Sequence, residues 1–514
     1  MGSPFARSSL GIFFILLLSW AEAGKNFRLL RQHVLKQQEE RAMREAYRRL
    51  KLTAQDPSHR IWNSVIEGTI LQPLDHFNRQ NPLTLNQRFW VHDGYWKQPG
   101  GPIFLYIGGE SSLSQFAILS GHHVEMAEKY GALLVALEHR FYGASINPDG
   151  LEDHNLWFLS SQQALLDLVS FHRYVTQKYS LTPNNTWICF GGSYPGSLAA
   201  WFRLKFPHLV FAAVASSAPV KAQLDFTGYN QVVGASLRNP VVGGSKECLE
   251  AVAEAFSTVD SLLRAGELDR LAKDFLSCEP LEGPDDYTLL VSNLADNFMG
   301  TVQYNDEGIP SANVRLLCGL MTNRSAGSTY QRLIATSNMF LDNLNTQCMQ
   351  NSHQQELQNL RNTNISVGGI GERQWFFQTC TEFGYYQTCE NSSCPFSQFM
   401  TLQYSLDICK QVFNISSGSI QEAVSFTNDD YGADHPKASH VLFVNGDIDP
   451  WHALGVLKNQ SHSEVAILIN GTAHAADMMP SSPADPLPLV EARRRINFQV
   501  GTWLKLARDI HGAS

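Results

Sequence analysis

The chain lacks an excess of basic residues. Its 39 lysines and arginines are outnumbered by 48 aspartates and glutamates, so the net charge is -9. A dedicated nucleic-acid-binding protein needs a basic face to bind phosphates, so this acidic net charge disfavours that class. Internal repeats and low-complexity tracts are also missing. With 44% apolar and 17% charged residues over 514 positions, the composition predicts a globular protein of two or more domains.

Long apolar stretches are missing after the first two dozen residues. Leu10 to Trp20 forms a short apolar core, less than the ~20 residues needed to span a bilayer. Arg7 precedes this core and Ala21-Glu22-Ala23 follows it, an arrangement typical of a signal peptide. We therefore expect residues 1–23 to be removed in the secretory pathway and the mature protein to have no membrane span. An uncleaved membrane anchor is the alternative.

Cysteine is absent before Cys189, and the other eight cysteines lie between Cys248 and Cys409. That clustering predicts a disulfide-linked region folded in an oxidising compartment. Cys189 lies on an apolar strand and is expected to be a small buried core residue. Seven Asn-x-Ser/Thr sequons agree with the secretory route, and we expect glycans on them. The sequon asparagines are Asn184, Asn323, Asn364, Asn391, Asn414, Asn459 and Asn470.

Short apolar runs alternate with amphipathic segments in two parts of the chain. Such runs are typical of parallel strands covered by helices on both faces. Between the two parts, from about residue 225 to residue 431, the pattern is helical and holds the eight clustered cysteines. An α/β sheet interrupted by a large helical cap accounts for this order. The expected strands are residues 102–107, 132–137, 186–190, 211–215, 441–444 and 465–469, with a closing helix over 491–509.

These patterns divide the chain into five segments. The second segment is polar, basic and helix-prone, and it is interpreted either as a peripheral helix or as a removable pro-region. The helical cap separates the two parts of the α/β domain. The expected segments are 1–23 (signal peptide), 24–60 (N-terminal segment), 61–224 (first part of the α/β domain), 225–431 (cap) and 432–514 (second part of the α/β domain).

One serine lies on a glycine-rich turn between an expected strand and an expected helix. Ser193 stands in the segment Gly191-Gly192-Ser193-Tyr194-Pro195-Gly196. An α/β-hydrolase holds its nucleophile on such a strained turn, where a neighbouring base can take the hydroxyl proton. The pattern therefore indicates a nucleophile, with an ordinary glycine-rich turn as the alternative. Pro195 departs from strict Gly-x-Ser-x-Gly by replacing the second glycine.

An acid and a histidine should follow the serine in that order. Asp447 and Asp449 come directly after the strand at 441–444, and His474 follows the next strand. These positions at strand ends are where α/β-hydrolases carry the two groups, and spacing alone leaves both aspartates open. His139 is a rival base, but it precedes the serine and so has the wrong chain order.

Two backbone N–H groups are expected to bind the negative charge that develops on the reacting oxygen. One belongs to Tyr194, directly after the nucleophile. The other belongs to Gly109, in the loop after the strand at 102–107. Glu138 and Arg140 lie at the end of another strand, and we expect them to form a structural ion pair or to support the site from behind.

These motifs together resemble the S28 serine carboxypeptidase family. The matching segments span nearly the whole mature chain. Residues 190–219, with Trp451 and His452, are most similar to a thymic branch of that family. The matching segments are residues 74–77, 108–110, 138–143, 191–194, 378–383 and 445–451.

The resemblance implies an α/β-hydrolase fold with a helical, disulfide-rich cap inserted before the acid. It implies that Ser193, Asp449 and His474 form the catalytic triad, and it selects Asp449 over Asp447 because the family acid directly precedes Pro-Trp. This chemistry needs neither a metal nor an organic cofactor. The disulfides that the resemblance implies are Cys248–Cys318, Cys278–Cys348, Cys380–Cys409 and Cys389–Cys394.

Two departures from the family pattern concern the surroundings of the nucleophile. Proline-selective members carry Gly and then Met after Ser-Tyr-Gly, whereas this chain has Pro195 followed by Gly196-Ser197. The histidine is followed by Ala475-Ala476-Asp477 instead of His-Leu-Asp. The catalytic groups are kept, but the preference for proline stays open. The residues expected in the substrate pocket are Glu110, Trp451, Ser197 and Glu382.

The expected activity is that of a serine peptidase that cleaves short peptides through an acyl-enzyme. It would act as an exopeptidase, either a dipeptidyl-peptidase or a carboxypeptidase, or as a restricted endopeptidase. The endosomal or lysosomal lumen is the expected location, with secretion as the alternative. The thymic resemblance implies production of self-peptides for class II antigen presentation, and family analogy implies a homodimer. A lumenal esterase or lipase and a non-catalytic hydrolase-like binding protein are the alternative functions.

Overall fold

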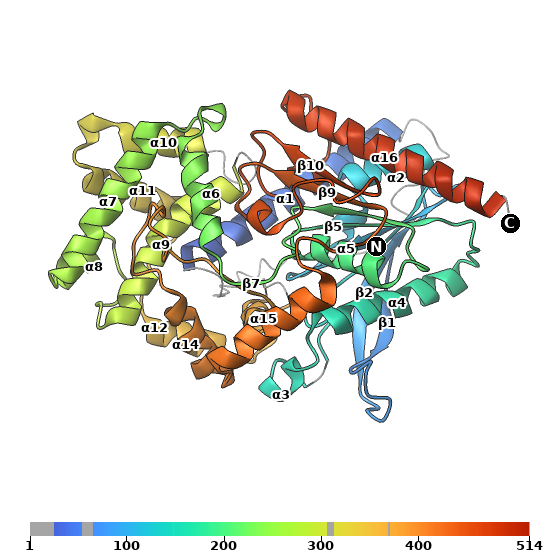
Figure 1. Cartoon of the computed structure of the whole chain (residues 1–514), viewed down its shortest axis with the longest axis horizontal. Coiled ribbons are helices and arrows are strands. Elements are labelled where there is room, and N and C mark those ends of the chain that lie inside the picture. Colours follow the sequence, from blue (N-terminus) through green and yellow to red (C-terminus); the bar gives the residue numbers. More distant parts are fainter. Residues whose placement is uncertain (1–24, 54–64, 148, 306–312, 368–370, 513–514) are drawn as a thin grey trace, which may run out of the picture.

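An eight-stranded sheet forms the centre of one part of the molecule (Figure 1). The computed structural model describes residues 25–53, 65–147, 149–305, 313–367 and 371–512, so the expected signal peptide lies outside the described residues. The strands are β1 (Val65–Pro73), β2 (Thr84–His92), β3 (Ile103–Ile107), β4 (Leu133–Leu137), β5 (Trp187–Gly192), β6 (Ala212–Ser216), β9 (Val441–Gly446) and β10 (Glu464–Ile469).

The strand order of this sheet is β1-β2-β4-β3-β5-β6-β9-β10. β1 and β2 are antiparallel to their neighbours, whereas the strands from β4 to β10 run parallel. The carboxyl ends of β3, β5, β9 and β10 therefore meet at one edge of the sheet. All the loops that carry the expected catalytic groups follow these four strands.

Helices cover both faces of the sheet, as the continuous apolar runs predicted. Along β3, Ile103 and Leu105 pack with the α4 and α5 side, whereas Phe104 packs with the α2 and α16 side. This alternation follows from the two-residue period of a strand. The helices of this part are α2 (His122–Tyr130), α3 (Asp153–Leu156), α4 (Ser161–Lys178), α5 (Tyr194–Lys205) and α16 (Leu487–Gly512).

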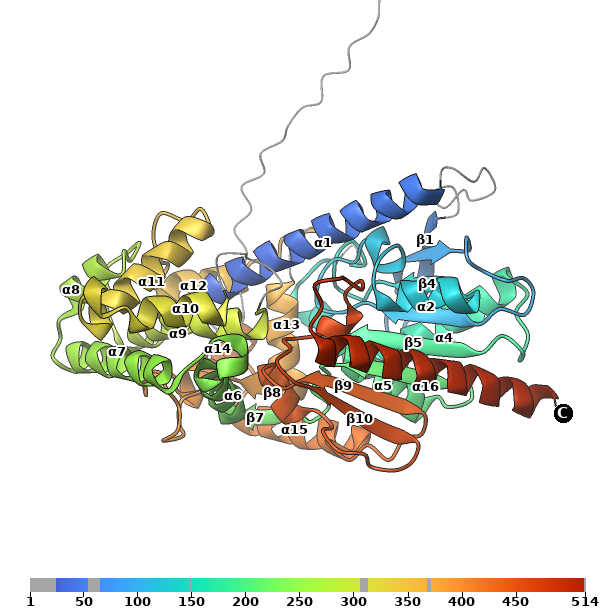
Figure 2. The same ribbon diagram turned by 90° about the horizontal axis from the view of Figure 1, so that it is seen from above.

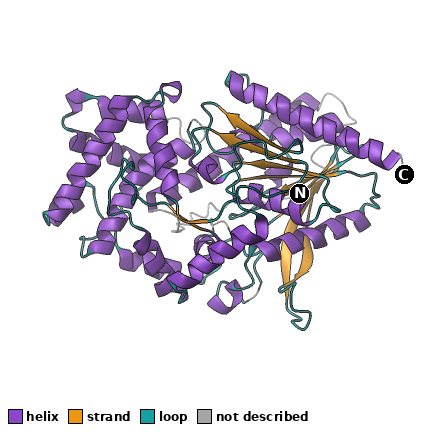
Figure 3. Cartoon of the chain, in the orientation of Figure 1, coloured by secondary structure: helices purple, strands orange, loops and turns teal. Residues whose placement is uncertain are grey.

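The cap lies between β6 and β9 in the chain and is mostly helical (Figure 3). Its two short strands, β7 (Gln223–Asp225) and β8 (Gly384–Tyr386), pair in parallel. The helices are α6 (Thr227–Arg238), α7 (Lys246–Arg264), α8 (Leu268–Asp274), α9 (Pro284–Gln303), α10 (Val314–Thr322), α11 (Thr329–Asn343), α12 (His353–Leu360), α13 (Glu372–Gln378), α14 (Leu402–Phe413) and α15 (Ser417–Tyr431). This order confirms an α/β-hydrolase fold with an inserted helical cap.

Covalent cross-links within the described residues are confined to the cap. All four disulfides that the resemblance implied are present. Cys189 is free and buried on β5, and burial raises the pKa of its thiol, so it is an inert core residue as predicted. All seven sequon asparagines are exposed to solvent.

The N-terminal segment forms a long helix, α1 (Lys25–Thr53), that lies across both the cap and the sheet domain (Figure 2). It contacts α9 of the cap and the short 3-10 helix Gln115–Ile118 beside the sheet. Leu30 and Val34 are almost fully buried in the main core. The segment is thus a docked helix in this structure. No helix among the described ranges is long and apolar enough to cross a membrane.

Candidate active site

Ser193 stands on a strained turn between β5 and α5. Its backbone angles are φ 63° and ψ -135°, a region that residues with side chains rarely adopt. The turn requires glycine on both sides, because a Cβ at Gly191 would lie 2.1 Å from the Pro195 carbonyl oxygen. A Cβ at Gly196 would lie 2.7 Å from the Ser216 carbonyl oxygen. This geometry is that of a nucleophile elbow, as the strand–turn–helix pattern predicted.

The loop after β3 packs directly against this turn. A Cβ at Gly109 would lie 2.3 Å from Cγ of Pro195, so the absence of a side chain allows the close approach. Proline is accommodated here because it lies in the first turn of α5, where an N–H would have no partner within the helix. Tyr194 is the first residue of α5, and its N–H likewise has no acceptor in the helix. Tyr194 and Gly109 therefore remain candidates for the oxyanion-binding N–H groups.

Asp449 and His474 meet at the ends of β9 and β10. Nδ1 of His474 lies 2.9 Å from both carboxylate oxygens of Asp449, and Asp449 is fully buried. Asp447 points elsewhere: its carboxylate accepts a hydrogen bond of 2.6 Å from the Gly471 N–H, and burial raises its pKa. A carboxylate on Nδ1 fixes the imidazole orientation and leaves Nε2 for proton transfer. The contact thus falls on the aspartate that the resemblance selected.

Ser193 and His474 line one cavity of about 200 Å³. Gly109, Glu110 and Trp451 line the same cavity. Residues from four strand ends, far apart in the sequence, are therefore gathered around one space. A serine, a buried carboxylate–imidazole pair and two backbone N–H groups at such a site can perform acyl transfer.

Ser197 and Glu382, which we expected in the substrate pocket, do not lie among the residues that line this cavity. Ser197 is fully buried one turn into α5, behind the nucleophile. Glu382 is buried and accepts hydrogen bonds from the Ser161 N–H at 2.8 Å and from Nε2 of Gln378 at 3.0 Å. Burial raises the pKa of Glu382. Glu382 was expected here because it lies in a matching motif, and Ser197 because it lies in the stretch where proline-selective members carry their methionine. Neither side chain lines the cavity.

His139, the rival base, is buried behind the nucleophile elbow. Its Nε2 lies 3.0 Å from Oη of Tyr194, and its Nδ1 lies 2.7 Å from the Arg140 carbonyl oxygen. Burial lowers the pKa of His139 to about 4. The residue does not line the cavity that holds Ser193, so its position agrees with the rejection that chain order suggested.

Glu138 and Arg140 are structural residues, but they do not pair with each other. Oε1 of Glu138 lies 2.6 Å from Arg88, which β2 places opposite it across the sheet. Arg140 lies 2.6 Å from the buried carboxylate of Asp167 on α4. The expected Glu138–Arg140 pair is therefore wrong, because each residue finds its partner on a neighbouring element.

The cap contributes a residue that the sequence did not single out. Gln303, at the end of α9, accepts a hydrogen bond of 3.0 Å from the His474 N–H through its backbone oxygen. Its side-chain Oε1 accepts hydrogen bonds from Nε1 of Trp451 at 2.9 Å and from Oη of Tyr229 at 2.6 Å. No motif surrounds Gln303, so a pattern search had no signal with which to find it.

The carboxyl end of β6 ties the nucleophile turn to the histidine loop. The Ser216 carbonyl oxygen accepts a hydrogen bond of 2.9 Å from the Ser193 N–H, and its hydroxyl donates to Asp477 at 2.6 Å. The Ser217 hydroxyl accepts a hydrogen bond of 2.8 Å from the Ala475 N–H. Burial raises the pKa of Asp477 to about 6. These contacts hold the two loops in a fixed relation.

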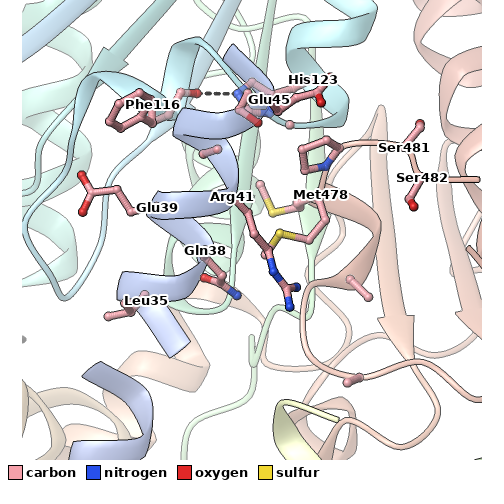
Figure 4. Close-up of a pocket in the computed structure, with 18 of the residues that line it drawn as sticks. Leu35, Gln38, Glu39, Arg41, Glu45, Phe116, His123, Met478, Ser481 and Ser482 are labelled. Atoms are coloured by element: carbon pink, nitrogen blue, oxygen red, sulfur yellow. Dashed lines mark hydrogen bonds between the residues drawn. The ribbon is translucent and has the colours of Figure 1, made fainter. Parts of the chain in front are cut away.

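The docked helix α1 reaches the same cavity. Arg31 forms an ion pair of 2.5 Å with Glu110, and Arg31, Leu35 and Gln38 line the cavity beside Ser193. A larger groove of about 1240 Å³ continues from it between α1 and the loop that carries Met478 (Figure 4). The basic character of the segment was visible in the sequence, but its contact with the site was not.

Known proteins resemble this chain over most of its length. The family model described as serine carboxypeptidase S28 matches residues 72–496. Thymus-specific serine protease from human is 45% identical over 86% of this chain and 87% of its own length; the mouse protein of the same name is 44% identical over 85% and 87%. Lysosomal Pro-X carboxypeptidase from Bos taurus is 30% identical over 81% and 84%. The chain therefore belongs to the serine carboxypeptidase S28 family and is a serine peptidase.

Proposed function

We propose that the protein hydrolyses short peptides through an acyl-enzyme on Ser193. The observation that carries this proposal is the contact between His474 and buried Asp449 in the loops around the Ser193 cavity. His474 takes the hydroxyl proton of Ser193 as its oxygen attacks the scissile carbonyl carbon, and it later gives that proton to the leaving amine. Asp449 orients the imidazole and stabilises its charged form. Water then hydrolyses the acyl-enzyme.

The N–H groups of Tyr194 and Gly109 would bind the oxyanion of the tetrahedral intermediate. Their support is geometric: the first belongs to the residue after the nucleophile, and the second lies in a loop packed on the same turn. Glu110 and Trp451 would form walls of the substrate pocket, since both line the cavity. Neither a metal nor an organic cofactor takes part in these steps.

The size of the site supports action near one end of a peptide. A cavity of about 200 Å³, bordered by the sheet loops, the cap and α1, has room for only a short part of a substrate and excludes a folded protein chain. We infer an exopeptidase, with the choice between dipeptidyl-peptidase and carboxypeptidase left to experiment. The cap would select substrates by access and not by chemistry.

The secretory pathway is the proposed route, with the endosomal or lysosomal lumen as its destination and secretion as the alternative. Four disulfides support folding in an oxidising compartment, and the exposed sequon asparagines are open to glycosylation. A relative named lysosomal supports the destination. Similarity to thymus-specific serine protease supports production of self-peptides for class II presentation.

A fluorophosphonate probe and a peptide library test the proposal together. Wild-type protein should be labelled and should trim library peptides at one terminus, whereas Ser193→Ala should do neither. Labelling that persists in Ser193→Ala would overturn the assignment of the nucleophile. Cleavage at random with respect to both termini would overturn the exopeptidase. Turnover of carboxylic esters without cleavage of any peptide would favour the esterase alternative.

A further inference from the structure

The helix α1 forms one border of the active-site cavity. It contacts α9 in the cap and the 3-10 helix Gln115–Ile118 beside the sheet, so it spans the junction of the two parts (Figure 2). Leu30 and Val34 anchor one half in the main core, and Ala46 packs with Leu119 at the other half. Between these anchors, the polar face of α1 borders the cavity that Ser193 lines.

Arg31 places a positive charge inside that cavity. Its guanidinium lies 2.5 Å from Oε1 of Glu110, and both residues are only 9% exposed. Glu110 directly follows Gly109, whose N–H is a candidate oxyanion group, so the carboxylate lies beside the place where the scissile carbonyl would bind. Tyr106, near the same carboxylate, stays neutral because burial and the charge of Glu110 raise its pKa to about 12. Among the described residues, the cation that pairs with Glu110 comes from α1.

A carboxylate this deeply buried is costly unless a cation neutralises it. The family model matches residues 72–496, a range that includes Glu110 and excludes all of α1. The carboxylate thus belongs to the shared catalytic part, and its partner comes from outside that part. A substrate group that binds at Glu110 must displace the side chain of Arg31, and only a positive group would keep the buried carboxylate neutralised.

We propose that Glu110 is a specificity site for a positively charged nitrogen group of the substrate, and that Arg31 occupies it as an internal mimic while α1 is docked. This inference rests on the proposed peptidase function. The recognised group is either the free α-amino group of the peptide or a lysine or arginine side chain beside the scissile bond. The docked helix therefore competes with cationic substrates for a single carboxylate.

Steady-state kinetics of three full-length variants test this inference. Arg31→Gln, Glu110→Gln and the double variant are compared with wild type on peptides with a free or acetylated N-terminus, and with arginine or neutral citrulline beside the scissile bond. Arg31→Gln should raise kcat/KM for the cationic peptides about tenfold or more and leave the neutral peptides within twofold. Glu110→Gln should abolish the preference for cationic peptides. In the double variant, the loss of Arg31 should give no increase in kcat/KM relative to Glu110→Gln alone.

The peptide pair that shows the effect identifies the recognised group. A preference lost on acetylation indicates the α-amino group, and a preference lost with citrulline indicates the side chain. The double variant contains no unpaired charge, so it keeps the test valid if Glu110→Gln alone unfolds. Arg44→Gln is the matched control, since Arg44 lies on the same helix, 3.6 Å from Glu40 on the surface, and its loss should leave all kinetic constants unchanged.

Fluorophosphonate labelling separates the two possible failures. If no variant reacts with the probe, the peptidase function is overturned and the inference falls with it. If the variants are labelled but Arg31→Gln leaves kcat/KM for cationic peptides within twofold, the role of Arg31 is overturned. If Glu110→Gln, or the double variant where the single one does not fold, still prefers cationic peptides, Glu110 is not the specificity site.

Discussion

The sheet domain and the cap are stabilised by different means. All four disulfides fall between Cys248 and Cys409 in the cap, whereas the cysteine on the sheet, Cys189, is a free core residue. The parallel strands bury side chains on both faces, and this burial alone supplies a large stabilisation. The cap is built of helices joined by loops and adds covalent cross-links. In the cap, covalent cross-links therefore act together with burial, whereas the described sheet domain relies on burial.

The same two regions divide the work at the site. The proposed triad and the oxyanion groups all come from loops at strand ends, while Gln303 approaches from the cap and Arg31 from α1. Changes in the sheet loops should therefore alter the chemical step. Changes in the cap should alter stability or substrate binding. Four predictions compare the two regions, in catalysis and in stability.

The largest effect is expected from Asp449→Asn in the sheet domain. An asparagine in place of the carboxylate stabilises the wrong tautomer of His474, and kcat should fall by about 10⁴-fold while the fold is kept. Kinetics on one peptide substrate, with thermal unfolding measured in parallel, checks this result. Asp447→Asn is the control, since Asp447 binds the Gly471 N–H instead, and it should lose less than about tenfold. Equal losses in both variants would contradict the proposed role of Asp449.

Removal of a long-range cap disulfide should cost stability and leave the sheet domain in place. Cys248 and Cys318 are separated by 70 residues, and the chain-entropy model assigns such a bridge about 4 kcal/mol. The same model assigns about 2 kcal/mol to Cys389–Cys394, which are 5 residues apart. Denaturant unfolding of the two double-serine variants measures both values. If the two variants were destabilised equally, loop-closure entropy would not account for the contribution of these disulfides to the stability of the cap.

The buried carboxylate of Asp477 should make the sheet domain less stable as pH rises. Its pKa is about 6 in the folded protein against 3.8 in the reference state. The folded state therefore binds more protons between about pH 4 and pH 6, and stability falls through that window by at most about 3 kcal/mol. Asp477→Asn should flatten this dependence. Free energies of unfolding measured from pH 4 to pH 7 test this prediction. A variant with the same pH dependence of stability as the wild type would refute it.

The smallest effect is expected from the cap residue Gln303. Gln303→Leu removes the side-chain oxygen that accepts hydrogen bonds from Trp451 and Tyr229, which loosens one wall of the pocket. We expect kcat/KM to fall about tenfold, mainly through KM, since a lost buried hydrogen bond costs about 1–3 kcal/mol. Thr301→Val on the same helix is the control, because its hydroxyl bonds to the Asn297 carbonyl oxygen. A loss confined to kcat would place Gln303 in the chemical step instead.

Features that depend on a short stretch of chain could be predicted from the sequence. The strand expected at 102–107 is β3 at Ile103–Ile107, and the elbow at Ser193 follows from a strand, small residues and a helix in sequence. Strand-end placement also brought Asp449 and His474 together, because parallel strands end at one edge. The disulfide pairs required the family resemblance.

Features set by contacts between distant elements could not be predicted. Whether Ser197 and Glu382 face the cavity depends on how α5 and the cap pack, and no local pattern records this. Glu138 pairs with Arg88 through sheet register, not through sequence proximity. The ion pair between Arg31 and Glu110 forms only because α1 packs beside the site. The sequence therefore predicts which residues can act chemically, whereas tertiary packing determines which side chains line the cavity.

The strand order has a consequence for biosynthesis. β9 pairs with β6, but the ribosome makes the whole cap between Ser216 and Val441. At about 5–20 residues per second, this takes about 10–45 s, during which the edge of β6 is unpaired and prone to wrong association. Asp449 and His474 are translated only afterwards. A nascent chain therefore cannot hold an assembled catalytic site until its cap has been synthesised, which delays peptidase activity until the chain is nearly complete.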